Sequence, residues 1–219
     1  MSNPRDPSKY CVYVSNFPFI DNDGYVALCC KNANHKLPYH ISEHKLLDIW
    51  NSSEIKEIRR QLAYGEEPKG CHRCFEPERQ GVRSFRQKAL GGLLKQKGEV
   101  AYEHDNIIAL DMRLGNVCNL ACTMCFAGNS NSIYKQLPKM ADHWGWSEGH
   151  LETELEKYHA KNYGWPADEK AWDNILPSIT SHLRRVYFAG GEPMYLPPFI
   201  DAASKIREKA PQANITINT

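Results

Sequence analysis

The sequence lacks several features that would associate the protein with a membrane or a nucleic acid. No apolar run approaches the roughly 20 residues that a helix needs to cross a bilayer, and residues 1–7 contain no apolar stretch of the signal-peptide kind. Lysine plus arginine (27) nearly balances aspartate plus glutamate (26), so no nucleic-acid partner is indicated. Repeats and low-complexity tracts are also missing. We therefore expect a cytoplasmic protein with no membrane partner and ordinary globular composition.

Cysteine is the residue type that distinguishes this chain of 219 residues, which contains eight of them. Disulfides are disfavoured in the cytoplasm, where clustered cysteines more often bind metal. They fall into two groups, one in the first third of the chain and one near its middle. The first group is Cys11, Cys29, Cys30, Cys71 and Cys74, and the second is Cys118, Cys122 and Cys125. Two groups predict two metal sites.

The first third of the chain predicts a small unit with a hairpin and a helix. Residues 10–14 and 25–29 are rich in strand-forming residues, and residues 22–24 (Asn-Asp-Gly) are a strong turn signal, so we expect a β-hairpin over residues 10–30. A helix is expected to begin at the N-cap Asn51, with Glu54 completing a capping box. Gly65 is expected to end that helix.

The rest of the chain predicts strands that alternate with helices. Strands are expected at residues 107–114, 183–188 and 215–219, with a helix at 199–209. An insertion over residues 129–178 is expected to contain helices at 151–161 and 168–176, with a break at Pro138. Four tryptophans are expected to pack its own small core, namely Trp144, Trp146, Trp165 and Trp172. The alternation predicts an α/β fold with a parallel sheet.

Two short motifs follow the first two of these strands. The run Cys118-x3-Cys122-x2-Cys125 comes directly after the first, and three thiolates can hold a four-iron cluster while one iron keeps an open position. Residues 190–193 (Gly-Gly-Glu-Pro) follow the second strand, and a glycine pair lets the backbone approach a ligand closely. Alone, the first motif is also compatible with zinc or chance, and the second with an ordinary turn.

Together, these motifs resemble the radical S-adenosylmethionine (SAM) superfamily. The resemblance implies that Cys118, Cys122 and Cys125 bind a [4Fe–4S] cluster whose open iron chelates SAM. It also implies a SAM contact through Gly190, Gly191, Glu192 and Pro193. The implied reaction takes one electron from a donor such as flavodoxin or ferredoxin and cleaves SAM to a 5′-deoxyadenosyl radical. The radical then abstracts hydrogen from an unknown substrate, and peptides are one class that such relatives modify.

Four residues near these motifs have open roles. Met124 stands where the family usually has an aromatic residue, and it is expected to pack near SAM because methionine is apolar and adaptable. Glu192 either contacts SAM or caps the following turn. Arg113 and Asn116 flank the cysteine loop, where they either orient it by hydrogen bonds or lie at the surface.

The N-terminal cysteines resemble the auxiliary-cluster pattern of SPASM and twitch domains. Cys11 is followed after twelve residues by Gly24, and then after four residues by Cys29. The resemblance implies that Cys11, Cys29, Cys71 and Cys74 hold a second [4Fe–4S] cluster. A structural zinc site is the alternative, because four cysteines also suit tetrahedral zinc. Cys30 is the spare cysteine and is expected to be a small buried residue.

These inferences predict an α/β protein in two parts. Residues 1–105 would form a small α+β twitch-like module. Residues 106–219 would form the N-terminal part of a (βα) radical SAM barrel, with about three strands and the insertion 129–178. Since such a barrel has more strands, we expect the chain to be C-terminally truncated or completed by a partner. The alternatives are a non-catalytic zinc-binding module and an iron–sulfur electron carrier that never cleaves SAM.

Overall fold

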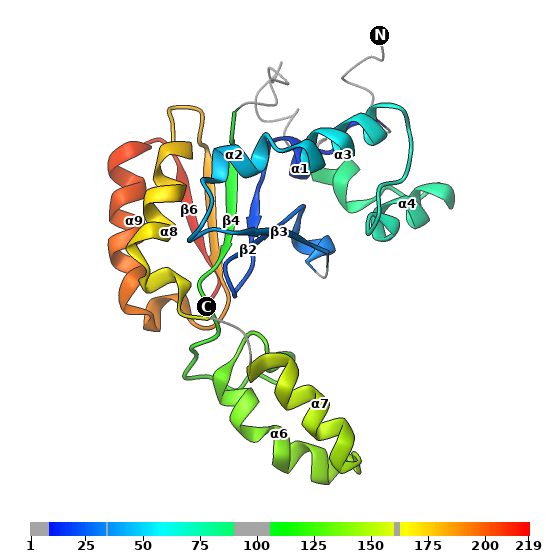
Figure 1. Cartoon of the computed structure of the whole chain (residues 1–219), viewed down its shortest axis with the longest axis vertical. Helices are drawn as coiled ribbons and strands as arrows, with labels where there is room; N and C mark the ends of the chain where they lie inside the picture. The colour runs from blue at the N-terminus through cyan, green and yellow to red at the C-terminus, as the bar shows by residue number, and fades with distance from the viewer. Residues whose placement is uncertain (1–8, 34, 90–105, 160–162) are drawn as a thin grey trace.

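The computed structural model describes residues 9–33, 35–89, 106–159 and 163–219, and its centre is a six-stranded mixed sheet (Figure 1). The strands are β1 (Phe19–Ile20), β2 (Tyr25–Ala27), β3 (Lys36–His40), β4 (Ala109–Arg113), β5 (Arg185–Ala189) and β6 (Asn214–Ile217), in the order β3-β2-β1-β4-β5-β6. Pairing is parallel from β1 through β4 and β5 to β6, and antiparallel from β1 through β2 to β3. The α/β class is confirmed, while the described residues form no closed barrel.

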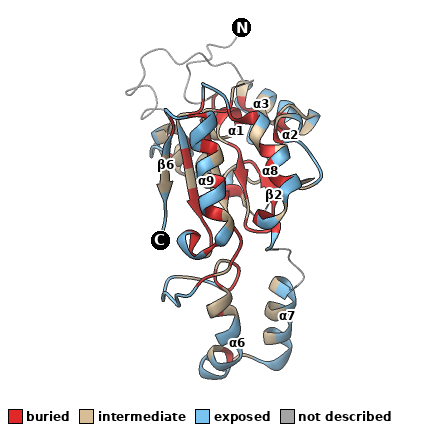
Figure 2. Cartoon of the chain, turned by 90° about the vertical axis from the view of Figure 1, so that its left-hand side faces the viewer, coloured by how far each residue is buried: buried red, intermediate tan, exposed pale blue. Residues whose placement is uncertain are grey.

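Two helices cover one face of the parallel strands. In both views α8 (Glu169–Ile175) and α9 (Pro197–Lys209) lie on the same side of the sheet (Figures 1 and 2). Alternate residues of a strand point to opposite faces, and the buried row of β4 and β5 consists of Leu110, Met112, Val186 and Phe188. Phe188 meets Phe199 of α9 edge to face, with ring centroids 5.2 Å apart. The expected strands after residue 107 and the helix at 199–209 are therefore confirmed.

The N-terminal hairpin is shorter than expected and joins the main sheet. Its strands are β1 and β2, and the predicted turn is confirmed, with the Gly24 N–H donating to the Asp21 carbonyl at 2.9 Å. The strand expected at residues 10–14 is wrong, because α1 (Val12–Asn16) is a helix. Val12 and Val14 are both buried, so packing overrides their strand propensity. The expected module boundary at residue 105 lies outside the described residues.

Three further helices of the N-terminal region are α2 (Leu46–Trp50), α3 (Ser53–Ala63) and α4 (His72–Arg79), and a helical segment follows at residues 85–89. The predicted helix is α3, but its N-cap is Ser52, whose hydroxyl accepts from the Ile55 N–H. Asn51 instead ends α2, because the preceding residues already form a helix. The predicted stop is confirmed, since α3 ends just before Gly65, whose φ is +77°.

The insertion forms a helical hairpin that projects from one end of the sheet (Figures 1 and 2). Its helices are α6 (Asn131–Trp144) and α7 (Glu148–His159). The predicted break at Pro138 is wrong, because α6 runs through this residue. Ile133, Leu137 and Ala141 lie on one side of α6 and are buried, and this packing offsets the lost backbone hydrogen bond.

The four tryptophans do not share one core. Trp165 begins the 3₁₀ turn η2 (Trp165–Ala167), and both it and Trp172 are buried in the main core, so their expected place in the insertion is wrong. The short turn η3 (Leu176–Ser178) follows α8. Trp146 packs against the insertion's own cluster as expected, whereas Trp144 is 52% exposed. Residues 165–175 thus belong to the layer on the sheet rather than to the projecting hairpin.

None of the helices in the described part of the chain has the length and apolar character that a bilayer span requires. The longest of those detailed here, α6, has 14 residues, against the roughly 20 that a spanning helix needs.

Candidate metal centres

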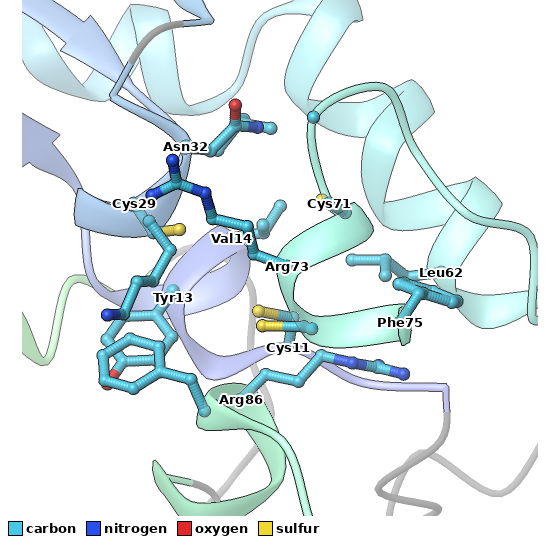
Figure 3. A pocket seen from close by; sticks show the side chains of 15 residues that line it. Cys11, Tyr13, Val14, Cys29, Asn32, Leu62, Cys71, Arg73, Phe75 and Arg86 are labelled. Atoms are coloured by element: carbon cyan, nitrogen blue, oxygen red, sulfur yellow. The ribbon is translucent and has the colours of Figure 1, made fainter. Parts of the chain in front are cut away.

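Four cysteines of the N-terminal region line one cavity. They are Cys11, Cys29, Cys71 and Cys74, the four that the sequence predicted to act together. Figure 3 shows Cys11, Cys29 and Cys71 around the same space. Cys11 is buried and the other three are half-buried. The fold therefore collects thiols from the beginning, the middle and the end of this region.

Local backbone hydrogen bonds position these thiols. Cys11 precedes α1, and its carbonyl accepts from the Ser15 N–H at 3.0 Å. Cys29 precedes the 3₁₀ turn η1 (Cys30–Asn32). Cys71 precedes α4, and its carbonyl accepts from the Cys74 N–H at 2.9 Å. Residues three apart share a helix face, so the two-residue gap places both of these thiols on the cavity side of α4.

Burial opposes ionisation of these thiols. Desolvation raises the pKa of Cys11 and Cys29, and it raises the pKa of Cys71 to about 12. The guanidinium of Arg86 acts in the opposite direction on the pKa of both Cys11 and Cys71. Since metals bind thiolates, metal binding at this site must release protons and becomes more favourable as the pH rises.

The four thiols are the donor set of either a [4Fe–4S] cluster or a tetrahedral zinc ion. The enclosed space between them is about 20 Å³. Tetrahedral zinc needs four sulfurs about 2.3 Å from one point. Over the described ranges, no three side chains of Cys, His, Asp or Glu are grouped as a single metal ion would require. The thiols thus lie farther apart than a bound zinc ion would hold them, and four thiols are also the ligands of a [4Fe–4S] cluster.

Cys30 faces a different cavity. It lies beside Asp111, Arg113 and Tyr187, and it does not line the four-thiol cavity. Cys30 is half-buried rather than buried as expected, and burial raises the pKa of its thiol. The adjacent residues Cys29 and Cys30 therefore line different cavities.

The second cysteine group lies in the loop that leaves β4. Cys118 is buried, Cys125 is half-buried and Cys122 is exposed. The Cys125 N–H donates to the Cys122 carbonyl at 2.9 Å, and the Leu120 N–H donates to the Cys118 Sγ at 3.3 Å. Burial raises the pKa of Cys125. This short loop thus carries three thiols, of which that of Cys122 is exposed to solvent.

The segment formed by residues 190–193 packs directly against this loop. The Glu192 N–H donates to the Val117 carbonyl, and the Gly191 N–H donates to the Asn129 carbonyl, both at 2.9 Å. Gly191 has φ +60°, and a Cβ there would collide with the Val117 carbonyl oxygen. The structure therefore brings the two sequence motifs together at the carboxyl ends of β4 and β5. The absence of a side chain at Gly191 allows this close approach to the cysteine loop.

Two residues predicted to contact SAM lie in opposite environments. Met124 is 94% exposed on the cysteine loop. Glu192 is 8% exposed, and its Oε1 accepts from the Met194 N–H at 3.1 Å at the start of the 3₁₀ turn η4 (Pro193–Tyr195). Of the two roles considered for Glu192, the capping role is the one that this hydrogen bond shows.

Polar residues just after the cysteines hold the loop, and sequence reasoning missed them. Asn131 accepts from the Cys118 N–H through Oδ1 at 3.0 Å, and Ser132 donates to the Cys118 carbonyl at 2.6 Å. The Asn116 carbonyl accepts from the Asn131 N–H at 2.8 Å, and Asn116 is buried. Asn116 therefore orients the loop through its backbone rather than lying at the surface.

A sequence signal for this arrangement exists. Ser130 is the N-cap of α6 and accepts from the Ile133 N–H, three residues ahead in the chain. A serine before an apolar periodic run is a helix start signal. The loop is also held from the hairpin, because the buried Asn22 donates to the Asn129 Oδ1 at 3.0 Å. This contact joins two residues that are 107 positions apart in the sequence, and no local pattern predicts it.

Arg113 lies on the face of the sheet that carries Asp111 and Tyr187, next to Cys30. It pairs with Asp111 at 3.2 Å and lies over the Tyr187 ring, 5.3 Å from the centroid. Burial raises the pKa of Asp111 to about 6, against the effect of Arg113. With Arg185 and Cys30, these residues line a cavity of about 360 Å³. Charged side chains and aromatic rings such as those of Tyr13, Phe17 and Phe85 thus share the walls of this cavity.

Comparison with known families assigns the first site. Residues 11–75 match the SPASM family model, described as an iron–sulfur cluster-binding domain. Residues 11–75 are a SPASM domain. The match begins at Cys11 and contains the other three cysteines of the four-thiol cavity, Cys29, Cys71 and Cys74. The same comparison detected no radical SAM barrel. Searches of curated proteins and of solved structures found no match.

The SPASM domain shares its sheet with the rest of the chain. Strand β1, inside the matched residues, pairs in parallel with β4, which leads into the second cysteine loop. Phe19 is aligned with Asp111 in this pairing. The four-thiol cavity and the second cysteine loop are therefore attached to one continuous sheet.

Proposed function

We propose that this chain acts as a radical SAM enzyme, or as part of one, whose SPASM domain holds an auxiliary [4Fe–4S] cluster. One observation carries the proposal: residues 190–193 hydrogen-bond to the loop that bears Cys118, Cys122 and Cys125. Each motif alone is ambiguous, but here both occupy the carboxyl ends of neighbouring parallel strands. Open α/β sheets bind their ligands at this edge.

In this proposal, the second loop provides three thiolates and leaves one iron for the cofactor. Cys118, Cys122 and Cys125 are the ligands, while Met124 and the backbone of residues 190–193 would contact SAM. These residues would hold the cluster and SAM, which would supply the radical chemistry for hydrogen abstraction from the substrate once a donor provides one electron. The chain itself positions these groups: Asn131 and Ser132 hold Cys118, and Gly191 allows the two loops to touch.

In this proposal the substrate binds on the open face of the sheet. The cavity on that face, which contains Asp111, Arg113 and Arg185, shares the wall residues Tyr13 and Phe85 with the four-thiol cavity. These two rings stack with centroids 4.6 Å apart. A substrate on this face, for which a peptide is one class, would lie beside the SPASM cluster. A flavodoxin- or ferredoxin-type donor would deliver the electron.

Anaerobic reconstitution with iron and sulfide tests this proposal. The wild-type chain should hold two clusters, whereas Cys74→Ser and Cys118→Ser should each lose about four irons and four sulfides. Cys30→Ser is the matched control, because Cys30 does not line the four-thiol cavity, and it should retain both clusters. With SAM and dithionite, the wild type and Cys30→Ser should form 5′-deoxyadenosine, and Cys118→Ser should not.

Each alternative has its own outcome. Zinc in place of iron and sulfide, in protein made under anaerobic and iron-replete conditions, would identify a zinc-binding module and refute the proposal. Cluster binding without 5′-deoxyadenosine would identify an electron carrier. Loss of about four irons and four sulfides in the Cys30→Ser control would show that Cys30 is a ligand and that the cysteines have been assigned wrongly.

A further inference from the structure

A buried arginine beyond the matched SPASM residues lines the four-thiol cavity. Arg86 is 3% exposed and lies in a helical segment, residues 85–89. Figure 3 shows its side chain beside Cys11 at the edge of the cavity. Taking a guanidinium out of water is costly unless it is paired and hydrogen-bonded. The partners of Arg86 therefore indicate what its burial achieves.

Arg86 joins the segments that carry the cysteines. Its Nε donates to the Glu78 Oε1 at 2.8 Å, and Nη2 donates to the other carboxylate oxygen. Glu78 belongs to α4, the helix that contains Cys74. A third guanidinium nitrogen, Nη1, donates to the Tyr10 carbonyl at 3.3 Å, directly before Cys11. One side chain thus connects the start of the SPASM domain with its last cysteine-bearing helix.

Only one member of this ion pair faces the cavity. Arg86 lines the cavity, whereas its partner Glu78 is not among the residues that line it. The guanidinium carbon also lies 4.6 Å from the centroid of Phe75, which lines the cavity too. Lys31 and Arg73 are further cations on this wall, but both are exposed to solvent. Their charges are therefore screened more strongly than that of Arg86.

We propose that the Arg86–Glu78 pair is part of the auxiliary-cluster site and sets its reduction potential. The inference rests on the proposed function of the SPASM domain. Reduction by an external one-electron donor adds one negative charge to the cavity and breaks no bond in the protein. The guanidinium of Arg86 stabilises that added charge and raises the reduction potential. The negative charge of Glu78 lowers it. Net charge near the cluster is a recognised determinant of its potential.

This proposal predicts opposite effects for the two halves of one ion pair. Arg86→Gln leaves the Glu78 carboxylate uncompensated, so the potential should fall. Glu78→Gln leaves the guanidinium uncompensated, so the potential should rise. We expect about a tenfold change in the reduction equilibrium in each case, which for a one-electron couple corresponds to about 59 mV. Arg86→Lys keeps the charge and should stay near the wild-type potential while binding less iron.

The measurement is an anaerobic redox titration followed by EPR. The starting protein is the full chain with all three cysteines of the second loop changed to serine, so that only the SPASM site is loaded. Arg79→Gln is the control, because Arg79 lies on the same helix with its side chain 56% exposed and should leave the potential unchanged. Iron and acid-labile sulfide are determined for every variant.

The sign of the shifts decides the inference. Equal potentials in Arg86→Gln and Glu78→Gln, or shifts in the same direction, would overturn it and leave the pair a purely structural link. If Arg86→Gln takes up no cluster, the rise in Glu78→Gln and the unchanged value in Arg86→Lys still test the sign. A starting protein without iron and sulfide would refute the SPASM cluster itself, and this inference with it.

Discussion

Replacing Gly191 by alanine tests the contact between the two motifs of the second site. A Cβ at this position would collide with the carbonyl oxygen of Val117 and lie 3.0 Å from its carbonyl carbon. Both atoms belong to backbone, so no flexible side chain can move aside. Val117 directly precedes Cys118, and any relief of the collision must shift the cysteine loop.

The expected loss of stability is the sum of three contributions. Gly191 has φ +60°, and a left-handed conformation costs an L-residue about 1–2 kcal/mol. The Glu192 N–H loses its 2.9 Å bond to the Val117 carbonyl, which contributes about 0.5–1.5 kcal/mol. Forcing extra volume into a packed site costs about 1–3 kcal/mol more. We expect Gly191→Ala to lower the free energy of unfolding by about 2.5–6.5 kcal/mol.

Gly65→Ala is the matched control for this substitution. Gly65 has φ +77°, but a Cβ there would meet nothing within 4 Å. The control should therefore lose only the conformational part, about 1–2 kcal/mol. Urea unfolding of the metal-free, reduced chains, followed by circular dichroism, gives both values. Iron content after reconstitution should fall in Gly191→Ala at the second site and stay unchanged in Gly65→Ala.

Equal losses of stability in the two alanine variants would refute this reasoning. That result would mean that residues 190–193 do not touch the cysteine loop in solution. Full iron content in Gly191→Ala would show, in addition, that the loop binds its cluster without the observed contact. The observation that carries the proposed function would then be lost.

Two further predictions concern the sheet and the core. Burial raises the pKa of Asp111 from 3.8 to about 6, so between these pH values the folded chain holds a proton that the unfolded chain has lost. The stability of the wild type relative to Asp111→Asn should therefore fall between about pH 4 and 7, by up to about 3 kcal/mol, and a flat difference in urea unfolding would contradict this. Trp50 is 1% exposed and donates to the Ser15 carbonyl, so Trp50→Ala should cost about 3–5 kcal/mol. Trp144 is 52% exposed, so Trp144→Ala should cost less than about 1 kcal/mol, and similar losses in the two variants would contradict the burial described here.

Much of the fold after residue 107 could be predicted because its signals are local. The buried strands β4 and β5 are apolar runs bounded by loops, and α9 shows helical periodicity between clear ends. The failures have an equally physical cause. Val12 and Val14 favour strands, but their burial in α1 decides their conformation. Pro138 normally interrupts a helix, but α6 tolerates it because its apolar face is packed.

The candidate sites, too, could be predicted from the sequence only in part. The resemblance of the cysteine pattern to SPASM and twitch domains grouped four N-terminal thiols that the fold places around one cavity, and it left Cys30 apart from them. It gave no sign of Arg86, which reaches Glu78 and the Tyr10 carbonyl from outside the cysteine pattern. Hydrogen bonds such as that between Asn22 and Asn129 join residues far apart in the chain. Contacts of this kind leave no periodicity for a local pattern to detect.

The sequence alone determined where the thiols stand along the chain, because their identity and spacing are properties of the residues. It also determined the strands and the helix α9 after residue 107, since hydrophobic periodicity is local. Only the tertiary structure decided which thiols share a cavity, that residues 190–193 touch the cysteine loop, and that a buried ion pair stands beside the SPASM site. These decisions depend on packing between distant segments, where the sheet and its helices set the geometry.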